Sequence, residues 1–171
     1  MTTSEDVEPT SFDKFLLLVG RLNYAWTNTE SLFVHIIAGL AEVDLETATV
    51  VFMTLNTSRA RIDLVQRLAK LDRVQGEERA KIIALTTRMQ KTSHIRNRYN
   101  HCIYAFDSNS AATHTILMRI ADRKNAIKMG QVEQLDQDTT DGIHNAIDEL
   151  GEINREIWEF LNKHRYPRNG I

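Results

Sequence analysis

The chain has 171 residues, of which 42% are hydrophobic and 26% are charged, and its formal net charge is −2. These values are typical of one globular domain with a substantial core, and the length argues against two domains. The single cysteine, Cys102, excludes an internal disulfide framework and a cysteine-based zinc site. No apolar run approaches the roughly 20 residues that span a bilayer, and the first ten residues lack the basic segment and apolar core that are typical of a signal peptide. We therefore expect a cytoplasmic protein without membrane contact.

Helical periodicity dominates the first hundred residues. Apolar side chains at helical spacing predict a first helix over residues 11–40. Asp44 has the character of an N-cap for a short helix that ends near Leu55, and Ser58 is the expected cap of a third helix. A fourth helix is predicted over residues 77–102.

The pattern changes after the fourth helix. Tyr104 and Phe106 alternate with smaller neighbours, residues 107–110 have turn chemistry, and residues 116–120 alternate again, which predicts a β-hairpin or an extended arm. Residues 140–164 return to helical spacing. The sequence therefore predicts an all-α bundle of four or five helices, with a small β-hairpin or extended arm between the last two long helices.

The expected organisation is a single domain. Residues 1–10 are polar and acidic and are expected to be a flexible N-terminus, residues 11–165 form the helical domain, and residues 166–171 form a flexible tail. The chain has no internal repeat, no low-complexity tract and no glycine-rich phosphate loop.

Charge is segregated along the sequence. Residues 1–50 carry eight acids against two cations, residues 56–101 carry eleven lysines and arginines against four acids, and residues 133–159 carry nine acids against one arginine. A basic middle is compatible with a phosphate-binding groove. The alternative is that basic and acidic helices pack beside each other, because charge asymmetry along a sequence does not fix asymmetry in space.

The candidate functional stretch runs from Arg96 to His101, late in the fourth predicted helix. It combines a permanent cation, the adjacent amide of Asn97 and an imidazole that titrates near neutrality, which are the groups that metal-free phosphodiester cleavage requires. On a helical wheel, His94, Asn97, Arg98 and His101 share one polar face.

The helical wheel also places Arg96 about 140° from His101, toward the apolar side. The two side chains can then share a phosphate only if the helix loosens, if the arginine reaches round, or if a second subunit supplies the missing partner. The alternative is a structural role for Arg96, for example an ion pair with Glu30 in the first helix.

An arginine, a polar residue and a histidine after four intervening positions, late in a helix of a small all-α domain, resemble the HEPN superfamily. The resemblance implies a dimer and a metal-independent endoribonuclease of the kind found in toxin–antitoxin, phage-defence and RNA-processing systems. It also implies that Arg96, Asn97 and His101 are the motif residues, with an antitoxin or other protein as a possible partner. Members paired with nucleotidyltransferase antitoxins often carry a tyrosine two residues after the histidine, whereas this chain has Ile103 there.

If the resemblance holds, His101 acts as general acid or base, Arg96 neutralises the transition-state phosphate, and Asn97 orients the phosphate or the imidazole by hydrogen bonds. We expect His94 and Arg98 to contact an RNA substrate and Tyr99 or Tyr104 to offer a stacking surface. The histidines show no metal-ligand spacing with carboxylates, so neither a metal nor another cofactor is expected.

Simpler roles compete with these assignments. His101 can be an exposed histidine at a helix C-terminus, Arg98 a solvated charge, and Tyr99 and Tyr104 packing residues. The chain as a whole can be a non-catalytic helical module that binds protein or RNA, or the inactive half of a two-component system.

Overall fold

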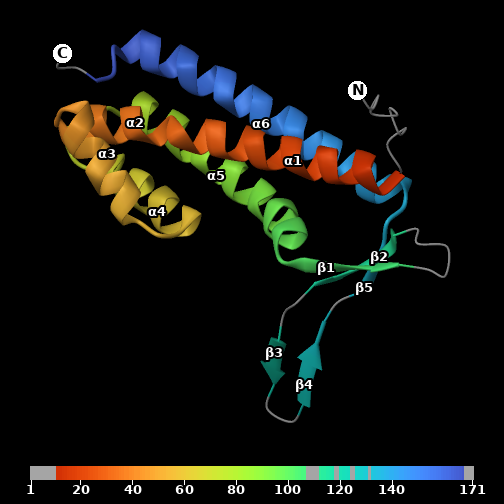
Figure 1. The fold of residues 1–171 in the computed structure, drawn as a ribbon. Coiled ribbons are helices and arrows are strands. Elements are labelled where there is room, and N and C mark those ends of the chain that lie inside the picture. The colour runs from red at the N-terminus through yellow and green to blue at the C-terminus, as the bar shows by residue number, and fades with distance from the viewer. Residues whose placement is uncertain (1–10, 107–111, 118–119, 124–125, 131, 168–171) are drawn as a thin grey trace, which may run out of the picture.

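The structure is a computed structural model that describes residues 11–106, 112–117, 120–123, 126–130 and 132–167. Within these ranges the chain forms helices α1 to α6 and strands β1 to β5, with every strand between α5 and α6 (Figure 1). The predicted helical bundle with a small β arm is therefore confirmed. The expected flexible N-terminus lies outside the described residues.

The first predicted helix is interrupted. The helix predicted over residues 11–40 consists of α1 (Ser11–Ser31) and α2 (Phe33–Ala41), separated by Leu32. The N–H of Leu32 donates to the carbonyl of Thr29 at 3.2 Å, three residues back rather than four, which tightens the backbone at this point. A single uninterrupted helix was therefore the wrong prediction, although the apolar face continues through both pieces.

The short helices begin at side-chain caps. Helix α3 (Leu45–Thr54) is capped as predicted by Asp44, whose carboxylate accepts a backbone N–H at 2.7 Å. Helix α4 (Ser58–Leu68) is capped by Thr57 rather than by the predicted Ser58, because the Thr57 hydroxyl accepts the N–H three residues later at 3.1 Å. Threonine and serine cap helices by the same bond, so the sequence located the turn to within one residue.

Two long helices complete the bundle. Helix α5 (Gly76–Asn100) matches its prediction to within two residues, and α6 (Gln137–His164) begins three residues earlier than predicted because Asp136 caps it. Helices α1, α5 and α6 lie alongside one another and enclose much of the core (Figure 1). The largest fully buried side chains are Trp26, Phe33, Leu22, Ile36, Ile37, Leu40, Ile62, Ile82, Leu85, Met89, Ile143 and Leu150.

The β arm consists of two separate antiparallel ladders. The predicted hairpin is confirmed by the pairing of β1 with β2, and β5 adds to β2, so that the strand order is β1-β2-β5. Strands β3 and β4 pair only with each other and project away from the helices (Figure 1). The predicted turn at residues 107–110 and Met118 lie outside the described residues. The strands are β1 (Cys102–Phe106), β2 (Ala112–Leu117), β3 (Ile120–Arg123), β4 (Ala126–Met129) and β5 (Val132–Gln134).

The folded domain extends beyond residue 165. Tyr166 is only 8% exposed, its ring packs edge to face against Phe160, and its hydroxyl bonds the buried carboxylate of Glu78. Gly39 lies against the same ring and leaves no room for a Cβ. The prediction of a flexible tail from residue 166 is therefore wrong for Tyr166, because its aromatic ring fills the end of the bundle.

Candidate functional site

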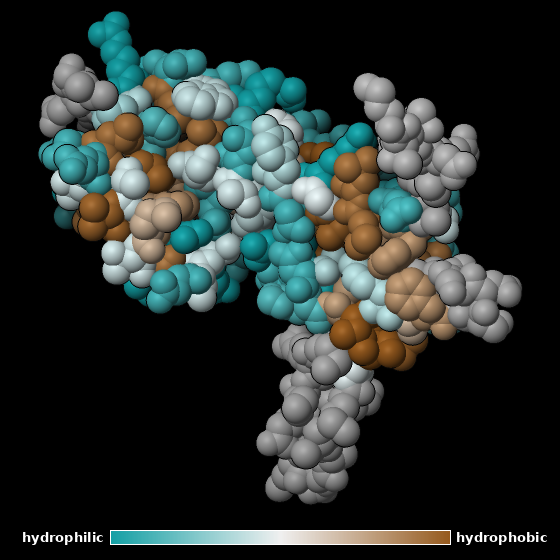
Figure 2. Space-filling view, in the orientation of Figure 1, coloured by the Kyte–Doolittle hydropathy of each residue, from teal (hydrophilic) through white to brown (hydrophobic). Residues whose placement is uncertain are grey.

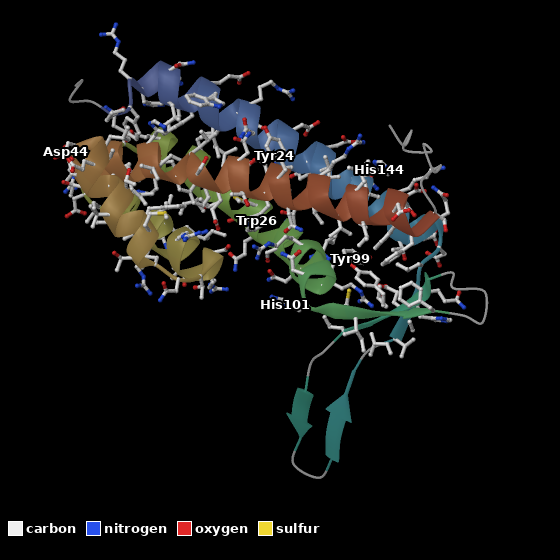
Figure 3. The ribbon with its side chains drawn as sticks, viewed as in Figure 1. Tyr24, Trp26, Asp44, Tyr99, His101 and His144 are labelled. Carbon is white, nitrogen blue, oxygen red and sulfur yellow. The ribbon has the colours of Figure 1, made fainter. Side chains whose placement is uncertain are left out.

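The motif occupies the last turns of α5, where the chain changes from helix to strand. Asn100 is the last helical residue, and His101 leaves the helix with φ −126° and ψ 17°. The His101 N–H still bonds the carbonyl of Arg98 at 3.2 Å, and β1 begins at the next residue. The motif histidine therefore lies at the junction of the helical bundle and the β arm (Figure 3).

Arg96 lies against the core side of the helix, as the helical wheel predicts. Its guanidinium carbon is 5.6 Å from the centroid of the Trp26 ring, and its Nη1 donates to Asn97 Oδ1 at 2.9 Å. Trp26 is 1% exposed, so the arginine lies over a fully buried ring. The Nε atom of Arg96 is shielded from solvent and has no hydrogen-bond partner among the described residues. Contacts on two sides therefore limit the positions open to this guanidinium.

Glu30 does not pair with Arg96. Its carboxylate accepts a bond from Arg61 Nη1 at 2.7 Å, and the Arg61 guanidinium also lies over the Phe52 ring at 4.2 Å. The predicted Arg96–Glu30 alternative is wrong, because the cation that neutralises this buried acid comes from α4 rather than α5. Arg96 is thereby left without a carboxylate partner in the described part of the chain.

Arg98 is engaged with the β arm. Its side chain is 18% exposed and forms an ion pair with Glu133 of β5, which rules out the solvated charge that one interpretation of the sequence proposed. His94 lies one turn earlier on α5 and lines the same hollow of about 400 Å³, together with Thr139 and Gly142 of α6. The structure thus brings two predicted substrate-binding residues together, with a carboxylate already bound to one of them.

His101 is exposed and separate from Arg96. No hydrogen bond or ion pair of its imidazole is found among the described residues, with Arg96 and Asn97 included. Its neighbour Asn100 forms a reciprocal amide pair with Asn23 of α1, with both N···O distances at 2.8 Å. This pair fixes the end of α5 against α1. Asn23 was missed by the sequence argument, although an amide within an apolar helix stripe is a detectable signal.

Tyr104 packs inside an aromatic cluster instead of standing free. Its ring lies 5.2 Å from Phe12 and 5.9 Å from Phe15, both edge to face, and Phe15 contacts Tyr99 at 5.7 Å. Burial raises the pKa of Tyr99 to about 12, with the nearby Glu133 carboxylate as a smaller contribution, and burial also raises the pKa of Tyr104. Both tyrosines are therefore packing residues, as the alternative interpretation of the sequence expected.

Two cations of the basic middle, Lys81 and Arg88, are neutralised by the acidic C-terminal helix. Arg88 bonds Glu149 at 2.7 Å and Glu156 at 2.5 Å, and Lys81 bonds Glu156 at 2.5 Å. These pairs join α5 to α6 along their length. A phosphate-binding groove is accordingly the wrong interpretation for these cations, and the alternative of adjacent helices with opposite charge is correct for them.

No family model matches the chain, and comparison with curated proteins and with solved structures yields no significant match. Within the described ranges, no helix combines the length and apolarity needed to cross a bilayer. No group of three His, Cys, Asp or Glu side chains in the same ranges is arranged to hold a metal ion. The end of α5, with Arg96, Asn97 and His101, is therefore the candidate site.

Proposed function

We propose that this protein is a HEPN-like, metal-independent endoribonuclease that acts as a homodimer, in the cytoplasm. The observation that carries the proposal is the end of α5, where Arg96 is held by Asn97 and Trp26 while the imidazole of His101 is open to solvent. An oriented guanidinium without a carboxylate partner is suited to a phosphate oxyanion.

Each motif residue has a distinct chemical task in this proposal. His101 removes the proton of a ribose 2′-hydroxyl, whose oxygen then attacks the adjacent phosphorus. Arg96 stabilises the charge that develops on the non-bridging oxygens, and Asn97 keeps the guanidinium in place. The P–O5′ bond breaks as the 5′-oxygen receives a proton, which leaves a 2′,3′-cyclic phosphate and a 5′-hydroxyl end. A second His101 can supply that proton.

A second copy of the chain completes the proposed site. Within one chain Arg96 faces the core and His101 faces solvent, so a single phosphate is better served by side chains from two protomers. Directly after the motif, Ile103, Ile116 and Val132 occupy adjacent positions across the three strands, and Ile103 and Val132 are 50% and 64% exposed. The apolar surface above the β3–β4 arm in Figure 2 supports burial against another molecule.

The substrate side of the proposal involves the α5–β5 hollow. His94 and Arg98 line it, and single-stranded RNA is the expected substrate because its phosphates and bases are both accessible. Glu133 must exchange for a phosphate if Arg98 is to contact the strand. Tyr104 does not contact the RNA in this proposal, and its ring instead packs against Phe12 and holds that side chain in place. A role as a toxin or phage-defence component, with an antitoxin as partner, follows from the resemblance alone.

The test is cleavage of labelled single-stranded RNA in excess chelator. Wild-type protein is expected to produce cyclic-phosphate ends, and His101→Ala is expected to lose about 100-fold or more in rate. His35→Gln is the matched control, because it also removes an imidazole but lies beside Trp158, far along the bundle. Inactive wild-type protein, or equal losses from both variants, would remove the proposal.

A non-catalytic interaction module is the second candidate. The row of Ile103, Ile116 and Val132, of which Ile103 and Val132 are exposed, favours it, since this row needs no chemistry to bind another surface. This candidate predicts RNA or protein binding without turnover. It also predicts that Ile103→Asp abolishes association while His101→Ala leaves it unchanged.

A further inference from the structure

A second hollow lies between the N-terminal halves of α1 and α6. Its volume is about 550 Å³, and its lining is partly apolar and partly cationic. Phe15 and Leu18 form a buried floor, while side chains from both helices surround the opening. The hollow adjoins the aromatic cluster that packs against the motif helix, because Phe12 and Phe15 belong to both.

Two cations, Lys14 and Arg21, line this hollow. Lys14 and Arg21 are seven residues apart on α1, which places them on one side of the helix two turns apart, and both are exposed. Neither forms an ion pair within the described part of the chain, in contrast to Lys81 and Arg88 on α5. The hollow therefore has a positive surface that the α5–α6 contact lacks.

The acid at the hollow is already in use. Asp136 caps α6 by accepting the Thr139 N–H at 2.9 Å, and the hydrogen bonds from Thr139 lower the pKa of this carboxyl, so it remains ionised in the cap. His144 and Thr140 of α6 add an imidazole and a hydroxyl to the lining. An anion entering the hollow meets two cations that form no ion pair with the described residues, and one carboxylate that accepts a backbone N–H.

An aromatic ring also lines the hollow. Phe12 is half-buried, and its ring packs in T-shaped contacts against Tyr104 at 5.2 Å and Phe106 at 5.1 Å between ring centroids. Because these contacts fix the ring where it lines the hollow, a planar group can stack on it without a large loss of side-chain freedom. The ligand that uses both features has a phosphate and a planar base.

We propose that this hollow is a nucleotide subsite for single-stranded RNA, in which Lys14 and Arg21 bind a backbone phosphate and Phe12 stacks on a base. The inference rests on the proposed ribonuclease function, because it extends the RNA path from the end of α5 across the aromatic cluster to α1 and α6. It assigns substrate contacts to the acidic first part of the sequence, which lies outside the basic segment that was predicted to form a phosphate-binding groove. A free nucleotide also has a phosphate and a planar base, so the experiment compares binding of an RNA strand with binding of a free nucleotide.

The experiment measures binding in the full-length His101→Ala background, in chelator, so that cleavage cannot interfere. A fluorescein-labelled oligouridine is titrated at several salt concentrations, and uridine monophosphate is titrated in parallel. Arg21→Gln and Lys14→Gln are compared with Arg67→Gln and Lys70→Gln, which remove exposed cations of the α4 region that have no ion pair among the described residues. Phe12→Leu tests stacking, with thermal unfolding measured beside it.

Arg21→Gln is expected to weaken oligouridine binding about five- to tenfold and to reduce the salt slope by about 0.7. Phe12→Leu is expected to weaken it about tenfold. Unchanged binding in the Arg21 and Lys14 variants, or equal loss in the Arg67 and Lys70 controls, would overturn the subsite. Tight monophosphate binding that depends on Arg21, without any effect on the oligonucleotide, would overturn the assignment to an RNA strand.

Failure of this inference is distinguishable from failure of the proposed function. Arg21-dependent RNA binding by a wild-type protein that never cleaves RNA would support the hollow and reject the nuclease. Cleavage that requires His101 while Arg21→Gln binds RNA normally would reject the hollow alone.

Discussion

The guanidinium of Arg96 lies over the ring of Trp26, with 5.6 Å between the guanidinium carbon and the ring centroid. This contact joins a candidate catalytic group directly to the hydrophobic core, since Trp26 is 1% exposed. A cation–π contact of this kind orients the arginine without neutralising it, whereas an ion pair would compete with the substrate. The position of Arg96 is therefore coupled to the packing of α1 against α5.

Arg96→Lys tests whether the planar donor fork matters. The lysine keeps the charge but loses the bond geometry that matches a phosphate, so RNA cleavage should fall about 100-fold while the melting temperature changes by less than about 3 °C. Cleavage assays and thermal unfolding measure the two effects. Lys91→Gln, which removes an exposed cation from the same helix, is the control and should retain activity. An active Arg96→Lys protein would assign Arg96 a purely structural role.

Glu133→Gln tests whether the β arm holds Arg98 away from substrate. Removing the carboxylate releases the 18%-exposed guanidinium of Arg98, and RNA affinity should rise about fivefold, equivalent to about 1 kcal/mol. Fluorescence anisotropy with labelled RNA measures the change. Glu46→Gln removes an exposed acid from α3 and controls for net charge. Unaltered or weaker binding by Glu133→Gln would mean that the ion pair only fastens β5 to α5.

The direction of Arg96 was predictable because it depends on a local rule. A rotation of about 100° per residue places Arg96 and His101 on different sides of any regular helix, whatever surrounds it. The bundle and the hairpin were predictable for the same reason, since periodicities of 3.6 and 2 residues are properties of short segments. Local chemistry also located the Asp44 cap.

Pairing across helices was not predictable from the same information. Glu30 pairs with Arg61 instead of Arg96 because α4 packs near the part of α1 that contains Glu30. Local sequence patterns do not indicate which helices are in contact. The neutralisation of Arg88 by α6 has the same origin. Tyr166 was assigned to a tail because only the assembled bundle provides the space beside Gly39 that its ring fills. Arg21 was overlooked because its segment is acidic as a whole.

Arg61→Ala is expected to destabilise the protein by about 3 kcal/mol. The substitution leaves the 7%-exposed Glu30 carboxylate without its cation, and an uncompensated buried charge is costly. Arg59→Ala breaks a neighbouring pair with Asp63 in which the arginine is 69% exposed, and it should cost less than about 0.5 kcal/mol. Chemical denaturation of both variants measures the difference. Similar losses in the two would contradict the burial argument.

Gly39→Ala is expected to destabilise the fold by about 3 kcal/mol, because its Cβ would lie 2.3 Å from atoms of the Tyr166 ring. The ring must then leave its site and lose the bond to Glu78. Gly20→Ala is the matched control, since nothing lies within 4 Å of its Cβ in the middle of α1, and it should stabilise the helix by about 0.5–1 kcal/mol. Opposite signs in thermal unfolding are the expected result. A tolerated Gly39→Ala would show that the C-terminal segment can move aside.

The α5–α6 ion pairs predict a loss of stability in acid. Hydrogen bonds from Lys81, and to a smaller extent from Arg88, lower the pKa of Glu156 below its ordinary value of 4.5. The carboxylate of Glu156 therefore binds a proton more weakly in the folded state than in the unfolded state. Its contribution is therefore complete above pH 4.5 and is lost as the pH falls through the lower pKa of the folded protein. Glu156→Gln should lower the free energy of unfolding by about 1 kcal/mol at neutral pH. The free energy of unfolding of this variant should also decrease less steeply than that of the wild type as the pH falls into the acid range. Glu152→Gln, whose carboxylate is 56% exposed and 3.5 Å from Arg88, should have a smaller effect. Denaturant unfolding across the acid range measures both variants, and parallel pH profiles for wild type and Glu156→Gln would show that these bonds do not stabilise the folded state.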